Sequence, residues 1–193
     1  MDARAAAGVV ASLVDDAIAL HAKVREMDLA PVVRAAEEIR RASAAGGKLL
    51  VFGNGGSAAD AQHFAAELVG RFERERVAMA AVALTTDTSV LTSVGNDYGF
   101  AQVFVRQIDA LGRAGDVACG ISTSGASANV LAALERAKAR GLVTVALTGR
   151  DGGAIGRTAD IHVNVPSNSA ARVQEVHRTL IHAICKLVEM ASE

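Results

Sequence analysis

From Lys48 onward, short apolar runs alternate with stretches of helical periodicity, and this alternation limits the chain to few folds. Five runs read as buried strands: Leu49–Phe52, Ala80–Leu84, Val117–Ile121, Val143–Leu147 and Ile161–Val165. Helical patterns separate the last four runs, and no tight hairpin turn joins two of them. Since parallel strands need long crossover connections, the pattern predicts an α/β domain with a doubly wound, parallel, five-stranded sheet.

The residues before Gly46-Gly47 carry no strand pattern and read as two helices. Seven side chains recur at helical spacing and form one apolar face: Val10, Leu13, Val14, Ala17, Ile18, His21 and Val24. A second helix begins near Pro31 and stops at the two glycines. Two such helices cannot bury both apolar faces by themselves, so we expect them to pack on the rest of the domain or on another subunit.

The length of 193 residues fits one compact domain. We expect a single domain over residues 1–193, with an N-terminal helical extension over residues 1–46 and an α/β core over residues 47–193. Hydrophobic residues make up 51% of the chain, which is too many for a disordered protein, and the 3% of aromatic residues predicts an aliphatic core. Cys119 and Cys185 lie far apart in apolar contexts, which predicts two buried thiols in a reducing compartment.

Charge and hydropathy exclude two classes of partner. Lys and Arg number 20 against 21 Asp and Glu, so the chain lacks the excess of positive charge that nucleic-acid binding requires. The longest uninterrupted apolar run, Val77–Leu84, is far shorter than the roughly 20 residues that cross a bilayer. The stretch Ala5–Val14 imitates the core of a signal peptide, but Asp15-Asp16 follow where small residues should stand. We expect a cytoplasmic protein.

The segment Ser122–Ser127 follows a predicted strand and precedes a predicted helix, which is where open α/β sheets bind ligands. Four of its six positions carry hydroxyls: Ser122, Thr123, Ser124 and Ser127. Gly125 permits a close backbone approach, and the helix N-terminus adds free N–H groups. Because the chain has no P-loop lysine, this set suits a sugar phosphate better than ATP. The alternative interpretation is that the hydroxyls only cap the helix.

A second loop, Gly53–Ser57, also links a predicted strand to a helix. It does not complete the dinucleotide fingerprint G-x-G-x-x-G, since Ala58 stands where the third glycine belongs. This argues against a nicotinamide-dependent dehydrogenase. The glycines would instead let the backbone close around a polar ligand, with Asn54 and Ser57 as side-chain contacts.

His63 and Glu67 lie four residues apart on the helix after this loop, and so share one face. They could hold a divalent metal or act as a base with a neighbouring acid, although a surface ion pair is the commoner role of such a spacing. The last helix, predicted from about Ser169 to Met190, carries Gln174, His177 and His182. From spacing alone, both histidines read as structural residues.

The spacing of Gln174 and His182 limits what they can bind together. Along a straight helix they stand about 12 Å apart in rise and about 80° apart in azimuth. One metal ion could take both only through the long glutamine side chain, a bend, or ligands from two subunits. The polar segment Asn96–Gly99 is interpreted as a helix-capping turn.

The residues Gly53–Leu68 closely resemble the signature of phosphoheptose isomerases, which are sugar isomerase (SIS) domain enzymes. Further matches follow in order: Gly95–Phe100, Ile121–Ser127, Leu147–Gly153, Val165-Pro166 and Arg172–His177. The resemblance spans essentially the whole chain. It implies a flavodoxin-like three-layer sandwich, a homotetramer, and conversion of sedoheptulose 7-phosphate to D-glycero-D-manno-heptose 7-phosphate through an enediol(ate). That reaction is the first step of nucleotide-activated heptose biosynthesis, which serves lipopolysaccharide.

Carried over position by position, the resemblance also implies roles for single residues. It assigns one zinc ion per subunit to four ligands: His63, Glu67, Gln174 and His182. Glu67 would be the catalytic base and His182 its acid/base partner. The sugar would contact Asn54, Gly55, Gly56, Ser57, Glu67, Asn96, Asp97 and Gln174. The phosphate would lie on Ser122, Thr123, Ser124 and Ser127. A carboxylate that binds metal is a weaker base, so the two roles of Glu67 are in tension.

The alternative is a non-catalytic SIS-domain tetramer that binds a replication initiator protein. The segments Arg71–Arg76 and Thr85–Thr88 look somewhat like that branch of the superfamily. Those relatives lack the acid/base pair, whereas Glu67 and His182 are both present here. The pair favours the enzyme.

Overall fold

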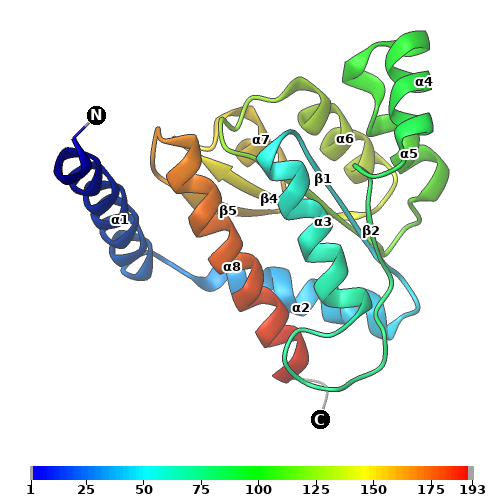
Figure 1. The fold of residues 1–193 in the computed structure, drawn as a ribbon. Coiled ribbons are helices and arrows are strands. Elements are labelled where there is room, and N and C mark those ends of the chain that lie inside the picture. Colours follow the sequence, from blue (N-terminus) through cyan, green and yellow to red (C-terminus); the bar gives the residue numbers. More distant parts are fainter. Residues whose placement is uncertain (1, 191–193) are drawn as a thin grey trace.

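A computed structural model describes residues 2–190, and within them five parallel strands form one sheet (Figure 1). The strands are β1 (Leu49–Gly53), β2 (Ala81–Ala83), β3 (Val117–Ser122), β4 (Val143–Gly149) and β5 (Ile161–Val165). Their order is β2-β1-β3-β4-β5, and every neighbouring pair is parallel. The order places the carboxyl ends of β1 and β3 side by side. The predicted doubly wound parallel sheet is confirmed.

Helices connect and cover these strands. Their bounds are α1 (Ala3–Arg25), α2 (Ala30–Ala44), α3 (Gly56–Val69), α4 (Thr88–Tyr98), α5 (Val105–Leu111), α6 (Ala128–Ala139), α7 (Gly153–Thr158) and α8 (Ala170–Met190). A short 3-10 helix, η1 (Phe100–Gln102), links α4 to α5. The helices α2, α3 and α8 pack on one face of the sheet, and α5, α6 and α7 pack on the other. The three-layer arrangement is confirmed.

Both faces of the sheet are buried because helices cover each of them, and successive strand residues point alternately to the two faces. Along β1, Leu49 and Val51 pack toward α2 and α3, whereas Leu50 and Phe52 pack toward α5 and α6. This explains why the strands read as continuous apolar runs rather than alternating ones. Cys119 is buried in the same sheet, and burial raises the pKa of its thiol to about 12.

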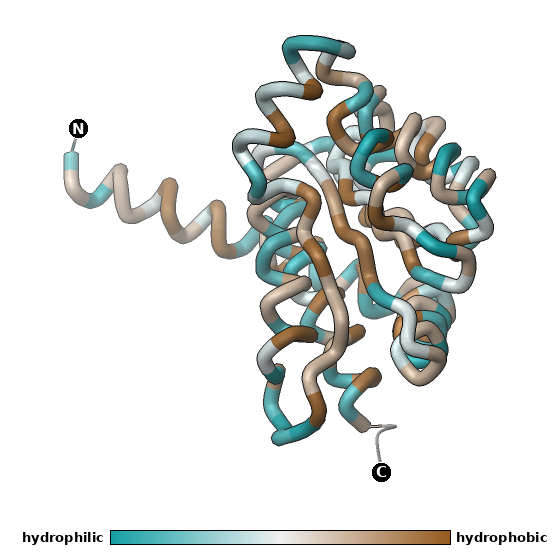
Figure 2. The backbone as a smooth tube through the Cα atoms, turned by 90° about the vertical axis from the view of Figure 1, so that its right-hand side faces the viewer, coloured by the Kyte–Doolittle hydropathy of each residue, from teal (hydrophilic) through white to brown (hydrophobic). Residues whose placement is uncertain are grey.

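The helix α1 stands away from the rest of the molecule and buries little of its surface (Figures 1 and 2). Leu20 and Val24, near its end, are buried, but five apolar side chains are about half or more exposed: Val9, Val10, Leu13, Val14 and Ile18. The expectation that this apolar face packs on the domain therefore holds only for its last turns. Two polar contacts attach α1 to α8: His21 to the Thr179 hydroxyl at 2.9 Å, and Arg172 to the carbonyl of Leu13.

By length and composition, α1 is also the one helix within residues 2–190 that would suffice to cross a bilayer. The prediction considered uninterrupted apolar runs only, and Gly8, Ser12 and Asp15-Asp16 interrupt the apolar sequence of α1. A single helix of this kind is weak evidence for a membrane.

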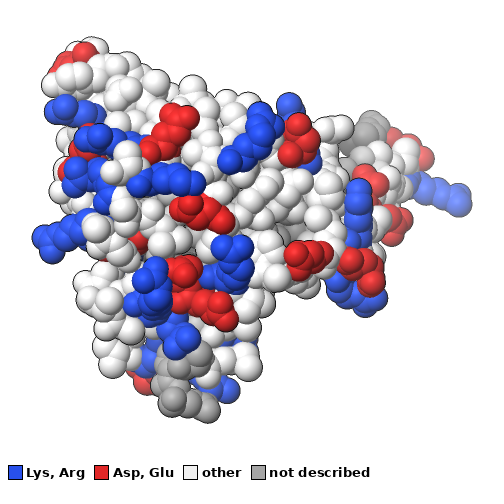
Figure 3. Space-filling model, turned by 180° about the vertical axis from the view of Figure 1, so that it is seen from behind, with Lys and Arg blue, Asp and Glu red and all other residues white. Residues whose placement is uncertain are grey.

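The face of the molecule in Figure 3 carries interspersed acidic and basic side chains, in line with the net charge of −1.

Candidate active site

The loops after β1 and β3 meet at the carboxyl edge of the sheet. The amides of Asn54 and Asn129 join them through two reciprocal hydrogen bonds, each 2.9 Å long. Asn54 was predicted as a ligand contact, and here its side chain holds the two loops together. Asn129 is buried in the first turn of α6. Sequence analysis missed it, although its place directly after the hydroxyl-rich segment was a usable indication.

The hydroxyls of Ser122, Ser124 and Ser127 converge in this loop. The Ser122 hydroxyl oxygen lies 2.9 Å from that of Ser127 and 3.3 Å from that of Ser124. Ser127 occupies the N-cap position of α6 but makes no side-chain hydrogen bond to the helix backbone. Helix capping therefore does not explain Ser127. Hydroxyls gathered beside the free N–H groups of a helix N-terminus are suited to bind an anion.

Gly125 is required where it stands. Its backbone is left-handed, with φ of +66°, and a Cβ at this position would overlap the carbonyl oxygen of Gly152. The N–H of Ile155 donates to the carbonyl of Gly125 at 3.1 Å. The close contact of these two loops fixes the position of the converging hydroxyls.

A second group of polar side chains lies on the neighbouring helices α3 and α8. The Nε2 atoms of His63 and His182 are 2.8 Å apart, and the Nε2 of His63 lies 3.1 Å from a carboxylate oxygen of Glu67. One ligand atom from each residue lies within 4.8 Å of the other two. The side chains of His63 and Glu67 are only 29% and 19% exposed. His63 and Glu67 thus form a partly buried pair, and His182 of α8 joins it.

The electrostatic surroundings of His63 favour its neutral form. Burial lowers the pKa of His63, and the positive charge of Arg178 lowers it further, while Glu67 opposes both effects. A neutral imidazole presents a lone pair to a metal or a proton. The hydrogen bond between the two facing Nε2 atoms needs one of them as donor and the other as acceptor.

Gln174 is not gathered with this cluster. Its amide packs against Gly56 at the start of α3, so closely that a Cβ at Gly56 would overlap it. One turn further along α8, the guanidinium of Arg178 binds one carboxylate oxygen of Asp60 at 2.6 and 3.0 Å. This ion pair lies between Gln174 and His182 along the helix. Asp60 is buried, and sequence analysis did not single it out.

Gly56, Gln174 and Arg178 line a cavity of about 640 Å³ between α3, α8 and α1. The exposed Gly55 that precedes α3 has φ of +56°, a conformation that favours glycine. Ser57 is buried in the first turn of the same helix. Of the predicted sugar contacts, Gly56 and Gln174 therefore border this cavity, and Asn54 lies at the carboxyl edge of the sheet.

Asn96 and Asp97 occupy a different place from the one predicted. The helix α4 continues to Tyr98, so both residues lie in its last turn rather than in a capping turn, and Gly99 ends the helix with φ of +83°. Asp87 caps the N-terminus of α4, and the helix then continues through Gly95 to Tyr98. The Asn96 amide donates to the Asp97 carboxylate at 2.7 Å, and both side chains are exposed.

His177 is structural, as its spacing suggested. It is fully buried, and its Nε2 donates to the carbonyl of Thr148 at 2.9 Å, at the end of β4. Burial lowers its pKa, although the bond to Thr148 and the charge of Asp60 act in the opposite direction. Its Nδ1 is buried without a hydrogen-bond partner among the described residues.

Comparisons with known proteins agree with this geometry. The model of the SIS domain family matches residues 13–149. The phosphoheptose isomerase of Neisseria meningitidis (serogroup C, strain FAM18) is 59% identical over 162 residues, which cover 82% of each chain. The structure of the phosphoheptose isomerase from Neisseria gonorrhoeae superposes with a TM-score of 0.90 at 49% identity, covering 95% of this chain and 98% of that one. The corresponding structure from Francisella tularensis gives 0.92 at 37% identity, covering 96% and 98%.

The matched proteins share both the fold and the extent of this chain, and the sequence resemblance to them is confirmed. The chain belongs to the SIS domain family and, within it, to the phosphoheptose isomerases.

Proposed function

We propose that the protein, acting as one SIS domain over residues 1–193, isomerises sedoheptulose 7-phosphate to D-glycero-D-manno-heptose 7-phosphate. The observation that supports this most directly is the grouping of one carboxylate and two imidazoles, from Glu67, His63 and His182, in a chain related to phosphoheptose isomerases. Aldose–ketose isomerisation needs a base that moves a proton between two adjacent carbons. It also needs a second group that moves the hydroxyl proton.

Glu67 is the base in this proposal. Its carboxylate takes a proton from one of carbons 1 and 2 and returns it to the other, through an enediol(ate). His182 exchanges the hydroxyl proton, a task for which an imidazole is suited near neutral pH. The phosphate is bound by Ser122, Thr123, Ser124 and Ser127, far from the reacting carbons, and it orients the sugar.

The donor set fits zinc. Two imidazole nitrogens and one carboxylate oxygen form the three-ligand set that leaves zinc an open position, and His63, Glu67 and His182 supply it. Zinc bound there would act as a Lewis acid toward the oxygens of the sugar. Gln174 completes the implied four-ligand set only if α8 bends or a second copy supplies it, because it packs against Gly56 in this chain.

Metal analysis tests this part of the proposal. Purified wild-type protein should carry one zinc ion per chain, and His63→Gln should lose it. Full activity after verified removal of all metal would contradict a catalytic role for zinc.

We also propose that the protein is a cytoplasmic homotetramer whose sites are completed between copies. Two observations support assembly. The first is the exposed apolar face of α1. The second is the distance along α3 from His63 and Glu67 to the sheet edge that carries the loop Ser122–Ser127, which is about 10 and 16 Å. Light scattering should show a tetramer, and Leu13→Asp should reduce its mass. An active monomer would contradict the shared site.

The replication-initiator alternative has less support. The resemblance of Arg71–Arg76 to that branch concerns a segment that in this chain packs against α8, and the relatives named above are isomerases. Incubation with sedoheptulose 7-phosphate, followed by NMR of the aldose product, tests the proposed activity. Failure of the wild-type protein to form the aldose, with or without zinc, would refute it.

A further inference from the structure

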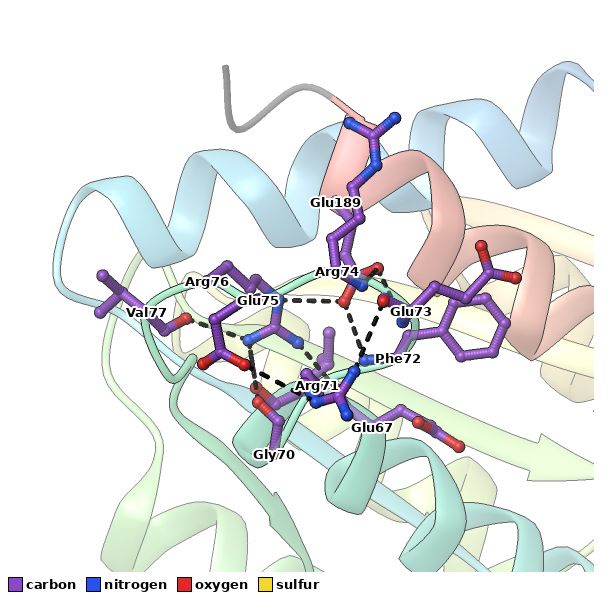
Figure 4. Close-up of polar contacts among 11 residues, drawn as sticks. Glu67, Gly70, Arg71, Phe72, Glu73, Arg74, Glu75, Arg76, Val77 and Glu189 are labelled. Carbon is purple, nitrogen blue, oxygen red and sulfur yellow. Dashed lines mark hydrogen bonds and ion pairs between the residues drawn. The ribbon is translucent and has the colours of Figure 1, made fainter.

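The carboxylate of Glu189, in the last turn of α8, is buried among backbone donors (Figure 4). One of its oxygens accepts from the N–H of Phe72 at 2.8 Å. The other accepts from the N–H groups of Glu73 and Arg74, both at 3.0 Å. Burial by itself raises the pKa of Glu189, but these three bonds and the charge of Arg76 outweigh burial and hold the pKa below its usual range. The group is therefore a carboxylate at neutral pH.

Arg76 connects this carboxylate to the end of α3. Its side chain is only 7% exposed, and its Nε lies 3.5 Å from Glu189. Its other nitrogens donate to the carbonyl of Glu67 at 2.7 Å and to that of Leu68 at 2.9 Å. These are carbonyls of the last turn of α3, which the helix itself leaves unpaired. A buried cation thus caps the turn that carries Glu67.

Phe72 connects the same carboxylate to His182. The ring of Phe72 is partly buried, and its centroid lies 5.3 Å from that of the His182 imidazole, with 32° between the planes. The His182 ring also contacts His63, whose ring centroid lies 5.0 Å from its own. The backbone N–H of Phe72 is held by Glu189, so the carboxylate sets where the aromatic ring stands.

We propose that Glu189 is a positioning residue for the isomerase: through Phe72 and Arg76 it holds His182 and Glu67 in one geometry. The inference rests on the proposed function, since it assigns Glu189 to the same site. The role goes beyond helix packing, because the buried Glu189 contacts two different supports of the site. One is the backbone of Phe72, whose ring packs on His182. The other is Arg76, which caps the last turn of α3, where Glu67 lies. No step of the reaction involves Glu189 itself.

Glu189→Gln is the informative change because it preserves size and removes charge. A glutamine oxygen can still accept from one backbone N–H, but its NH₂ group would face donors where the carboxylate now accepts. Arg76 would also lose its buried counter-ion. A displacement of catalytic groups by about 1 Å can cost about 100-fold in rate, so we expect kcat to fall at least about 10-fold. We expect KM to change by less than about threefold, because the phosphate loop lies elsewhere.

Two measurements distinguish positioning from general stability. The first is kcat and KM for sedoheptulose 7-phosphate, measured well below the unfolding temperature of each variant. The second is NMR of the histidine ring nitrogens in metal-free, 15N-labelled protein, with the His182 signals assigned from their loss in His182→Gln. Displaced His182 signals in folded Glu189→Gln, together with the fall in kcat, are the expected result. Wild-type signals with wild-type kcat would overturn the proposal.

Glu73→Gln is the matched control. It lies in the same loop and removes an exposed ion pair with Lys186, while the backbone contacts to Glu189 remain. We expect it to stay within about twofold of wild type, since exposed ion pairs contribute little. Glu189→Asp keeps the charge and should restore part of the lost kcat.

If Glu189→Gln does not fold, Phe72→Leu tests the same idea, because it removes the ring and leaves the carboxylate contacts in place. Unchanged His182 signals and kcat in that variant would overturn the proposal. Absence of aldose formation by the wild-type protein would instead refute the proposed function, while the NMR comparison would still report on positioning.

Discussion

The loop Ser122–Ser127, here called the phosphate loop after its proposed role, and the cluster of His63, Glu67 and His182 are built in different ways. The hydroxyls of Ser122, Ser124 and Ser127 come from one stretch of six residues and are gathered by the turn that follows β3. His63 and His182 are 119 residues apart in the chain and meet because α3 and α8 pack side by side on the sheet. The loop depends on local backbone geometry, whereas the cluster depends on the packing of two helices.

This difference separates the effects that substitutions should have. Changes in the loop should alter the binding of the phosphate, and changes in the cluster should alter the chemical step. Changes in the contacts between α3 and α8, such as the pair of Asp60 and Arg178, should first alter stability. The following predictions test that separation, in order of decreasing expected effect.

Glu67→Gln should lower kcat by at least about 100-fold, the usual contribution of a general base. The affinity for the substrate should change little, because the phosphate contacts remain. Steady-state kinetics with sedoheptulose 7-phosphate measure both quantities, and circular dichroism checks the fold. A near-wild-type kcat would remove Glu67 from the role of base.

Ser122→Ala combined with Ser124→Ala should weaken the binding of the sugar phosphate by at least about 100-fold, since hydrogen bonds to a charged group contribute about 1.5–3 kcal/mol each. Turnover at saturation should fall less than affinity, because the phosphate is remote from the reacting carbons. Calorimetry with the sugar phosphate measures the change. Ser43→Ala, in the last turn of α2 and far along the chain from this loop, is the control. Unchanged affinity in the double variant would leave the loop without a ligand role.

Arg178→Met should lower the free energy of unfolding by about 1–3 kcal/mol. It leaves the buried carboxylate of Asp60 without its partner, and the partial exposure of Arg178 moderates the cost of breaking the pair. Urea unfolding measures the change. Arg41→Met, which breaks an exposed pair with Glu38, should have almost no effect. Equal losses of unfolding free energy in the two variants would show that the pair of Asp60 and Arg178 stabilises the fold no more than an exposed pair does.

The smallest effect concerns pH. The pKa of His177 is lowered in the folded protein, whereas in the unfolded chain it returns to about 6.5. Below pH 6.5 the unfolded state therefore binds the extra proton first, and stability falls as the pH decreases toward the folded pKa, by at most about 1.4 kcal/mol per pH unit. His177→Gln keeps a donor for Thr148 and should flatten this slope. Urea unfolding between pH 5.5 and 7.5 tests it, and an unchanged slope would exclude His177 as its source.

Much of the fold could be predicted because its causes are local. Apolar runs of strand length such as Val117–Ile121, separated by helical periodicity, indicate parallel strands with crossover helices, and Pro31 and Gly46-Gly47 mark helix ends through their backbone preferences. The phosphate loop was predictable for the same reason, since its hydroxyls are neighbours in the sequence. The extent of α4 was not, because Gly95, Asn96 and Asp97 favour turns and caps, yet the helix continues through them to Tyr98.

The sequence by itself therefore determined the class of fold, the loops at the carboxyl edge of the sheet, and the family. Only the tertiary structure decided that His182 meets His63 and Glu67 while Gln174 does not, and that Asp60, Asn129 and Glu189 are buried polar contacts. Helical spacing fixes which residues share a face of one helix, but not which residue of another helix stands opposite. That is set by how α3 and α8 pack on the sheet, through contacts between residues more than 100 positions apart.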